Sequence, residues 1–188
     1  MKPLRTILLG LLVGLSIAAC DEKAELAQVP PPKEPGPDAI GHYCGMAVAE
    51  HEGPKGQIFI EGRSDPVWFS SVRDTLAFTM LPEEPKNLSA IYVNDMGRSA
   101  NWSQPEPGTW ILAQDALFVA GSTATGGMGA REVVPFGDHA VAERFRSVHG
   151  GEIFALGEVP EAFVLGDDDA VTAAPAASDS EHDMHASH

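Results

Sequence analysis

Residues 67–78 read VWFSSVRDTLAF, and residues 134–145 read VPFGDHAVAERF. Each stretch has one phenylalanine at the end of a short apolar run, which is typical of a strand, and a second phenylalanine nine positions later in a helix-like pattern. Further strand candidates are residues 44–50, 57–61 and 90–93 in the first half, and 111–119 (one long strand), 132–134 and 153–156 in the second. The sequence therefore predicts an α+β fold of two similar ββαβ units.

The two units are expected at residues 41–96 and 97–166, and the second range includes a linker rich in proline and glycine. Asp138 is a plausible N-cap of the second helix, and Gly150-Gly151 is a plausible end. Each unit has about 60 residues, which is small for independent stability. The pattern leaves open whether the units share one sheet or form two small domains.

The N-terminal segment has the pattern of a lipoprotein signal. Lys2 and Arg5 precede an apolar stretch that ends in LSIAAC, residues 15–20. The stretch is shorter than the ~20 residues that span a bilayer, so residues 1–19 are predicted to be a signal peptide with lipidation at Cys20. An ordinary signal peptide with an incidental Cys20 is the alternative. We expect the mature protein at the periplasmic face of a bacterial membrane; Asp21 favours the inner membrane, but either membrane stays possible.

Two segments flank the predicted fold. Residues 20–40 are rich in proline and are expected to be a tether from the lipid anchor, while residues 167–188 are acidic, lack apolar bulk and are expected to be disordered. The formal net charge is −15, and loss of Lys2 and Arg5 with the signal makes the mature chain more acidic. Such acidity argues against a nucleic-acid partner, because phosphate binding needs clustered Lys and Arg.

Cys44 is the main candidate for a functional residue. With Cys20 lipidated, Cys44 is the only other cysteine of the chain, and a lone thiol in an oxidising compartment is a liability unless something uses it. It lies in Cys44-Gly45-Met46, and on a strand these two sulfur side chains would face the same side. Thiolate plus thioether is the soft donor set that suits Cu(I). Alternatively, both are core residues.

Three further groups are candidate metal ligands. Met128 lies in the glycine-rich stretch TGGMG, residues 125–129, and either binds an ion or fills a small gap. His42 lies two residues before Cys44 and could supply an imidazole, although a solvent-facing role is common for such a histidine. His51 has an ordinary explanation at the end of an element. A loose metal-capturing cluster lies in the tail: His182, Met184, His185 and His188.

No motif of an enzyme was found: GxSxG, HExxH, the P-loop, the dinucleotide fingerprint and CxxC do not occur. The sequence therefore indicates a protein that is not an enzyme.

Several short motifs in order resemble the NosL lipoproteins, accessory proteins of nitrous oxide reductase. They are the lipidation site, Cys44-Gly45-Met46, Asp95 after a strand, Trp110 before residues 116–119, Met128-Gly129, and Phe136 with Gly150-Gly151. The resemblance implies two related ββαβ units, similar to a domain of organomercurial lyase. It also implies delivery of Cu(I) for the copper-sulfide centre of the reductase, with an ABC-type membrane complex as partner and the apo reductase as indirect recipient.

By the same resemblance, Cys44, Met46 and Met128 are the expected copper ligands. The chain departs from the family pattern at Gly127, where proline commonly precedes the methionine.

The sequence alone leaves two rival functions open. An organomercurial-lyase-like enzyme would need a pair of cysteines, whereas the mature domain offers one. A structural lipoprotein that docks a membrane complex would bind no metal.

Overall fold

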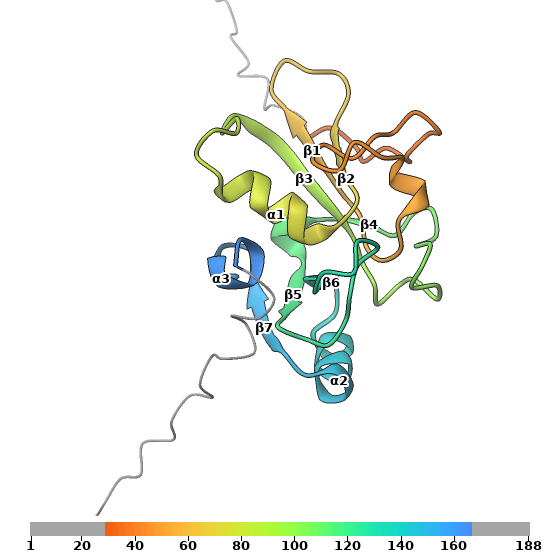
Figure 1. Cartoon of the computed structure of the whole chain (residues 1–188), viewed down its shortest axis with the longest axis vertical. Helices are drawn as coiled ribbons and strands as arrows, with labels where there is room; N and C mark the ends of the chain where they lie inside the picture. Colours follow the sequence, from red (N-terminus) through yellow and green to blue (C-terminus); the bar gives the residue numbers. More distant parts are fainter. Residues whose placement is uncertain (1–28, 167–188) are drawn as a thin grey trace, which may run out of the picture.

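The computed structural model describes residues 29–166, so the predicted signal peptide, Cys20 and the tail 167–188 lie outside the described residues. Two sets of elements follow one another in the same order (Figure 1). The first set is β1 (Gly56–Ile60), β2 (Val67–Phe69), α1 (Val72–Met80) and β3 (Leu88–Asn94). The second set is β5 (Leu117–Ala120), β6 (Val134–Phe136), α2 (His139–His149) and β7 (Glu152–Ala155). The predicted α+β fold with two ββαβ units is confirmed.

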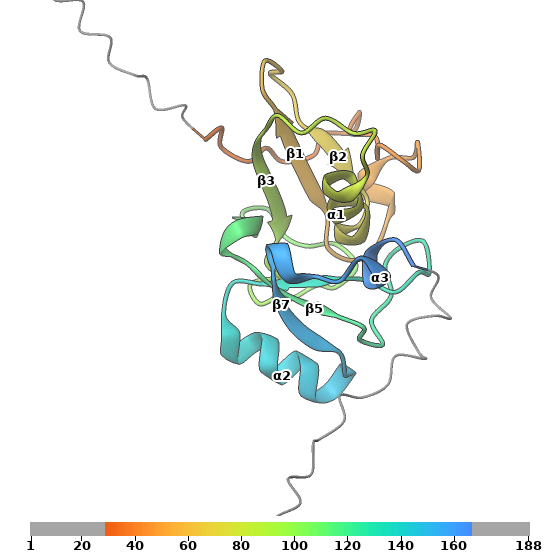
Figure 2. The ribbon, with the colours of Figure 1, turned by 90° about the vertical axis from the view of Figure 1, so that its left-hand side faces the viewer.

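The two units form separate antiparallel sheets. The first sheet has the order β2-β1-β3-β4, where β4 is Trp110–Leu112, and the second has the order β6-β5-β7. Three short 3₁₀ turns, η1 (Val48–Glu50), η2 (Ala113–Asp115) and η3 (Leu156–Glu158), and the helix α3 (Glu161–Val164) complete the described fold. Helix α3 packs against α1, and both views show the two helices side by side (Figure 2).

Two of the predicted strands are wrong. Residues 111–119 do not form one strand, because η2 separates β4 from β5 and β4 pairs with β3 of the first sheet. The backbone groups along the edge of β3 need partners, and β4 supplies them. Residues 44–50 form turns, an isolated bridge at Ala47 and the short η1, with Gly45 at a φ of 67°. A positive φ of that kind ends an extended run.

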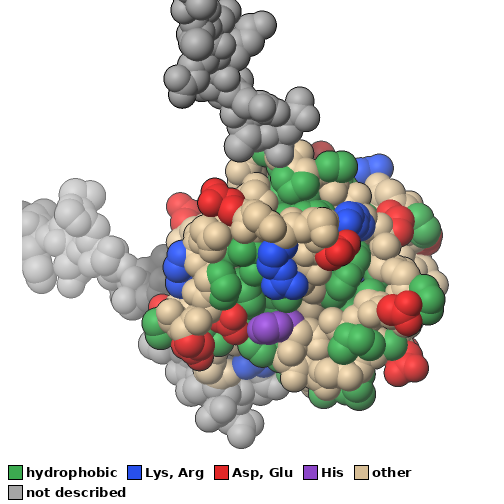
Figure 3. Space-filling model, turned by 90° about the horizontal axis from the view of Figure 1, so that it is seen from above, with side chains coloured by type: hydrophobic (Ala, Val, Ile, Leu, Met, Phe, Trp, Pro, Cys, Tyr) green, Lys and Arg blue, Asp and Glu red, His purple; other side chains and the backbone are tan. Residues whose placement is uncertain are grey.

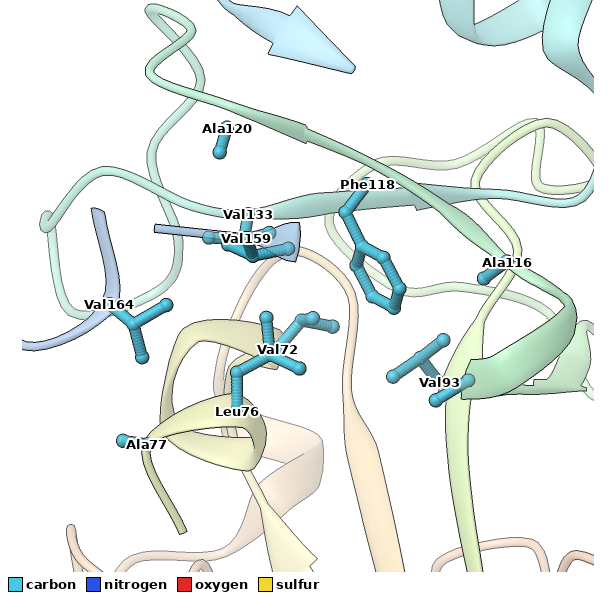
Figure 4. Close-up of a cluster of buried hydrophobic side chains, with 11 residues drawn as sticks. Val72, Leu76, Ala77, Val93, Ala116, Phe118, Ala120, Val133, Val159 and Val164 are labelled. Carbon is cyan, nitrogen blue, oxygen red and sulfur yellow. The ribbon is translucent and has the colours of Figure 1, made fainter. Parts of the chain in front are cut away.

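One hydrophobic core joins the two units, which answers the question that the sequence left open. Figure 4 shows Val72 and Leu76 of α1 facing Phe118 of β5, with Val93 of β3 beside them. The side chains of Val72, Leu76, Val93 and Phe118 are completely buried. Each unit alone would expose this surface, so the sheets are distinct but the core is shared.

Both main helices have side-chain caps at their first turn. Asp138 accepts a hydrogen bond from the Val141 amide, and α2 ends at Gly150 with a φ of 73°, as predicted. Ser71 accepts one from the Asp74 amide at 3.0 Å and so defines the start of α1. This second cap matters for function, because the candidate metal centre lies at this end of α1.

The described part of the predicted tether is docked on the first sheet. The backbone of Lys33 exchanges two hydrogen bonds of 2.9 Å with the Gln57 side chain, and the Trp110 indole donates to Glu34. Within residues 29–166, no helix is long and apolar enough to cross a membrane. On the face drawn in Figure 3, Lys and Arg side chains are interspersed with acidic and hydrophobic ones. This face has no broad basic patch of the kind that binds phosphates.

Candidate metal centre

Cys44 lies in a closed turn formed by residues 41–46. The Gly41 amide donates to the Met46 carbonyl at 2.9 Å, and the Gly45 amide donates to the Gly41 carbonyl at 2.9 Å. The turn is fixed to β2 by the His42 amide, which donates to the Trp68 carbonyl at 2.8 Å. Gly41 is required here, because a Cβ at this position would lie 2.6 Å from the Cys44 sulfur. The backbone thus holds the sulfur in one place.

The Cys44 sulfur faces the N-terminal end of α1. It lies 3.1 Å from the Ser70 hydroxyl, which is 2% exposed and directly precedes the N-cap Ser71. Cys44 is half-buried and is the free thiol of the described residues. The alternative of a fully buried core cysteine therefore does not hold.

His51 is the residue that the sequence analysis missed. Its Nε2 lies 3.7 Å from the Cys44 sulfur, and its side chain is 6% exposed. The short η1 after the turn reverses the chain and brings His51 back to the sulfur. No local pattern marks this histidine, since seven positions separate it from Cys44.

The Met128 loop is attached to the same segment. The Gly127 amide donates to the Glu52 carbonyl at 3.0 Å, and a Cβ at Gly127 would lie 2.8 Å from the His51 Cβ. Met128 therefore follows a residue in contact with His51, and its side chain is 59% exposed. Proline at position 127 could not donate this hydrogen bond, which is a physical reason for glycine in this chain. Such exposure also argues against a gap-filling role.

The other predicted ligands lie in different surroundings. Met46 is 40% exposed at the end of the Cys44 turn. The His42 ring instead lies against Phe69 and Phe78, and its Nε2 is 3.3 Å from Glu84. The Tyr43 hydroxyl donates to the same carboxylate at 2.9 Å. The structure thus brings Cys44, Met46, His51 and Met128 to one region and engages His42 elsewhere.

Buried titratable groups lie beside the Met128 loop, since a Cβ at Gly126 would lie 2.7 Å from Glu132 Oε2. Glu132 is 2% exposed; its Oε1 accepts hydrogen bonds from the Arg73 and Val133 amides, both at 2.9 Å. Its Oε2 has no hydrogen-bond partner among the described residues. Burial raises the pKa of Glu132 to about 8 and lowers the pKa of the neighbouring Lys55 to about 8. Burial also raises the pKa of Asp74, against the effect of its hydrogen bond with Ser71.

No group of three or more His, Cys, Asp and Glu side chains in residues 29–166 forms a ready metal site. A metal bound here would therefore depend on sulfur donors together with a single imidazole. Thiolate, thioether and imidazole are the donors typical of copper, and thiolate with thioether selects Cu(I).

Comparison with known proteins shows the family of this chain. The family model described as NosL matches residues 32–164, which is most of the chain. This chain belongs to the NosL family. A protein from Achromobacter cycloclastes called "Copper-binding lipoprotein NosL" is 45% identical over 86% of this chain and 85% of its own length. A protein of the same name from Stutzerimonas stutzeri is 32% identical over 84% of this chain and 80% of its own length.

A solved NosL structure has the same fold. The crystal structure of the copper chaperone NosL from Shewanella denitrificans matches with a TM-score of 0.66 and 32% identity, over 71% of this chain and 99% of that one. Membership of the NosL family was expected from the order of the short motifs and is confirmed. The ligand set Cys44, Met46, Met128 and His42 stays a prediction, as does lipidation of Cys20.

Proposed function

We propose that this protein is a lipid-anchored copper chaperone that binds Cu(I) through the Cys44 thiolate and delivers it for the copper-sulfide centre of nitrous oxide reductase. The observation that carries the proposal is the half-buried Cys44 sulfur 3.7 Å from the His51 imidazole. The exposed Met46 lies two residues after Cys44, and the exposed Met128 follows Gly127, which lies against His51. The names of the two curated relatives and of the solved structure support copper as the ion.

The spacing of sulfur and nitrogen suits one shared ion. With metal–sulfur and metal–nitrogen bonds of about 2.3 and 2.0 Å, two ligand atoms at a tetrahedral angle lie about 3.5 Å apart. The 3.7 Å between Cys44 Sγ and His51 Nε2 is close to that value. Cys44 and His51 would therefore form the fixed part of the centre. Met46 and Met128 would complete it from the solvent side, and His42 is the least favoured of the predicted ligands.

This arrangement also explains how the ion could leave. The thiolate and imidazole are held by backbone contacts and burial, whereas Met46 and Met128 are 40% and 59% exposed. A partner donor can replace an exposed thioether first and then take the ion from the thiolate. Such ligand exchange needs no redox step and no substrate turnover. The protein would act as a carrier, not as an enzyme.

The recipient follows from the family resemblance. We propose an ABC-type membrane complex as the partner and the apo reductase as the indirect recipient, with lipid on Cys20 holding the protein at the periplasmic face of a membrane. The names of the relatives support a lipoprotein. Around the centre, Ile40 and Tyr43 are 48% and 42% exposed, which offers apolar surface for docking.

The test is an anaerobic Cu(I) titration against a chromophoric competing chelator, with the wild type and Cys44→Ser. The serine variant keeps the size of the side chain and the contact with Ser70, so the fold should be retained, as circular dichroism would check. We expect tight binding of one ion in the wild type and its loss in the variant. If Cys44→Ser still binds Cu(I) tightly, Cys44 is not the copper ligand and the proposed centre is wrong.

Delivery needs a second measurement. Cells of a denitrifying host that produce Cys44→Ser as their NosL protein should accumulate nitrous oxide reductase without its copper-sulfide absorption. The reductase should regain that absorption with the wild type. A reductase with a normal copper-sulfide centre in the Cys44→Ser cells would contradict the delivery role, even if copper binding were confirmed.

A further inference from the structure

The Met128 loop is a closed backbone unit. The Glu132 amide donates to the Ala124 carbonyl at 2.9 Å, and a second hydrogen bond of the same length closes the loop nearer its tip. Residues 124–132 therefore form a hairpin-like loop with Glu132 at its base. Backbone bonds hold the internal shape of this loop, so the position of Met128 depends on what the loop as a whole is attached to.

The Glu132 side chain connects the base of this loop to helix α1. Its Oε1 accepts a hydrogen bond of 2.9 Å from the amide of Arg73, which lies in the first turn of α1. The chain just before α1 includes Ser70, whose hydroxyl lies 3.1 Å from the Cys44 sulfur. One carboxyl group therefore links the loop that carries Met128 to the segment that contacts Cys44.

The second oxygen of the same carboxyl group lies against the loop. A Cβ at Gly126 would lie 2.7 Å from Glu132 Oε2 and 4.0 Å from the Ser71 Cβ. Glycine at this position lets the loop backbone approach both groups closely. Oε2 has no hydrogen-bond partner within residues 29–166, so what it offers the loop there is van der Waals contact.

Stability alone does not account for this carboxyl group. Glu132 is 2% exposed, and burial of a carboxyl group with an unpartnered oxygen costs free energy. A cavity of about 370 Å³ lies next to it, and its lining includes Ser71, Gly126 and Met128. Because side chains of the protein do not fill this space, the contact with Glu132 supports the loop on this side.

We propose that Glu132 is a positioning residue of the copper centre, which holds the Met128 loop in a fixed place relative to Cys44. This inference rests on the proposed function, since it assumes that Cys44 and Met128 bind the same ion. Glu132 itself is not a ligand in this proposal, because its Oε1 accepts two backbone amides and carboxylates suit harder cations than Cu(I). A loop that is held in advance loses less conformational entropy when the ion binds, so its position raises the affinity.

Three substitutions separate the position of the loop from the charge of the carboxyl group. Glu132→Ala removes the link and leaves two buried amides without their acceptor, so urea unfolding must confirm that it folds. Glu132→Gln keeps an oxygen acceptor for both amides and nearly the same volume, and should rescue binding. Gly126→Ala leaves Glu132 intact and forces the loop away from Oε2, whereas its control Gly157→Ala meets open space.

Anaerobic competition with a chromophoric chelator measures the Cu(I) affinity of the full mature chain in detergent. We expect a loss of about tenfold in Glu132→Ala and in Gly126→Ala. Glu132→Gln and Gly157→Ala should stay within about twofold of the wild type. X-ray absorption at the copper edge should show one sulfur neighbour fewer in Glu132→Ala.

A destabilised control separates position from stability. Phe59 is buried in a different core cluster, on the first sheet, so Phe59→Leu lowers stability without a contact to the loop. This variant should keep both the affinity and the sulfur count of the wild type.

A double-mutant cycle tests whether Glu132 acts through Met128. Met128→Leu removes the thioether and keeps the loop backbone. If Glu132 acts by placing this thioether, Glu132→Ala should cost about tenfold in affinity in the wild-type background and less than about twofold in the Met128→Leu background. A purely structural effect would cost the same in both backgrounds.

Four results would overturn the proposal. They are equal losses in the two backgrounds of the cycle, an unchanged sulfur count in Glu132→Ala, wild-type affinity in Gly126→Ala, and a loss in Glu132→Gln as large as that in Glu132→Ala, which would mean that charge matters and position does not. If Glu132→Ala does not fold, the same cycle and the same sulfur count with Gly126→Ala decide the question.

Failure of the proposed function is recognised separately. Cys44→Ser would then bind Cu(I) as tightly as the wild type. If Cys44→Ser loses the ion while the cycle shows equal losses in both backgrounds, the copper centre stands and the positioning role of Glu132 alone is wrong.

Discussion

Cys44 Sγ and His51 Nε2 lie 3.7 Å apart, although one belongs to an exposed turn and the other is a buried side chain after a 3₁₀ turn. The Gly127–Glu52 hydrogen bond joins the Met128 loop to the same histidine segment. His51 thus lies between the thiol turn and the methionine loop. This position makes it the first target for mutation.

His51→Gln should weaken Cu(I) binding by at least about tenfold, or about 1.4 kcal/mol, because the imidazole nitrogen is lost while the volume is nearly kept. His139→Gln, on an exposed side chain at the start of α2, serves as the control and should leave the affinity within about twofold. Competition titration with a chelator measures both. Equal losses in the two variants would reject His51 as a ligand.

Gly127→Ala should displace the Met128 loop. Its Cβ would lie 2.6 Å from the Glu52 backbone nitrogen, which is not a flexible side-chain end. We expect Cu(I) affinity to fall by about tenfold, as is common when a supporting contact shifts. Gly157→Ala, which meets open space, is the matched control and should bind normally. An unchanged affinity in Gly127→Ala would show that the position of the loop does not matter.

Met128→Leu and Met46→Leu replace a thioether by a hydrocarbon of similar size. Both side chains are exposed, so the free energy of unfolding should change by less than about 0.5 kcal/mol. Each variant should nevertheless lose Cu(I) affinity and release the ion faster to a competing chelator. X-ray absorption at the copper edge should show fewer sulfur neighbours. A sulfur count equal to that of the wild type would exclude the replaced methionine as a ligand.

Because the pKa of Glu132 is raised, we expect the free energy of unfolding to fall as the pH rises. Burial raises the pKa of Glu132 from 4.5 to about 8, so between these values the folded protein keeps a proton that the unfolded chain releases. The free energy of unfolding should therefore decrease from pH 5 to pH 8, by about 1–3 kcal/mol. Lys55, whose pKa is lowered to about 8, acts in the opposite direction only above pH 8.

Glu132→Gln should remove this pH dependence, because the amide oxygen still accepts the Arg73 and Val133 amides and the side chain no longer titrates. Urea unfolding of the metal-free protein at several pH values tests the prediction. The same slope in wild type and variant would assign the effect to another group.

Phe118→Ala tests whether the two units unfold as one. Phe118 is completely buried in the core that includes Val72 and Val93 of the first unit. The variant should lose about 3–5 kcal/mol of stability, and both units should still unfold in a single transition. Val148→Ala, on a side chain that is 76% exposed, should cost almost nothing. Separate transitions by tryptophan fluorescence and circular dichroism would contradict a common core.

Local sequence pattern determined the repeated ββαβ order, the Asp138 cap and the helix end at Gly150, because periodicity, caps and glycine act over a few residues. Side-chain chemistry alone also singled out Cys44, Met46 and Met128. Only the tertiary structure placed β4 in the first sheet, joined both units in one core and brought His51 to the Cys44 sulfur. These relationships depend on contacts between segments that no local pattern links, so packing of the whole chain decided them.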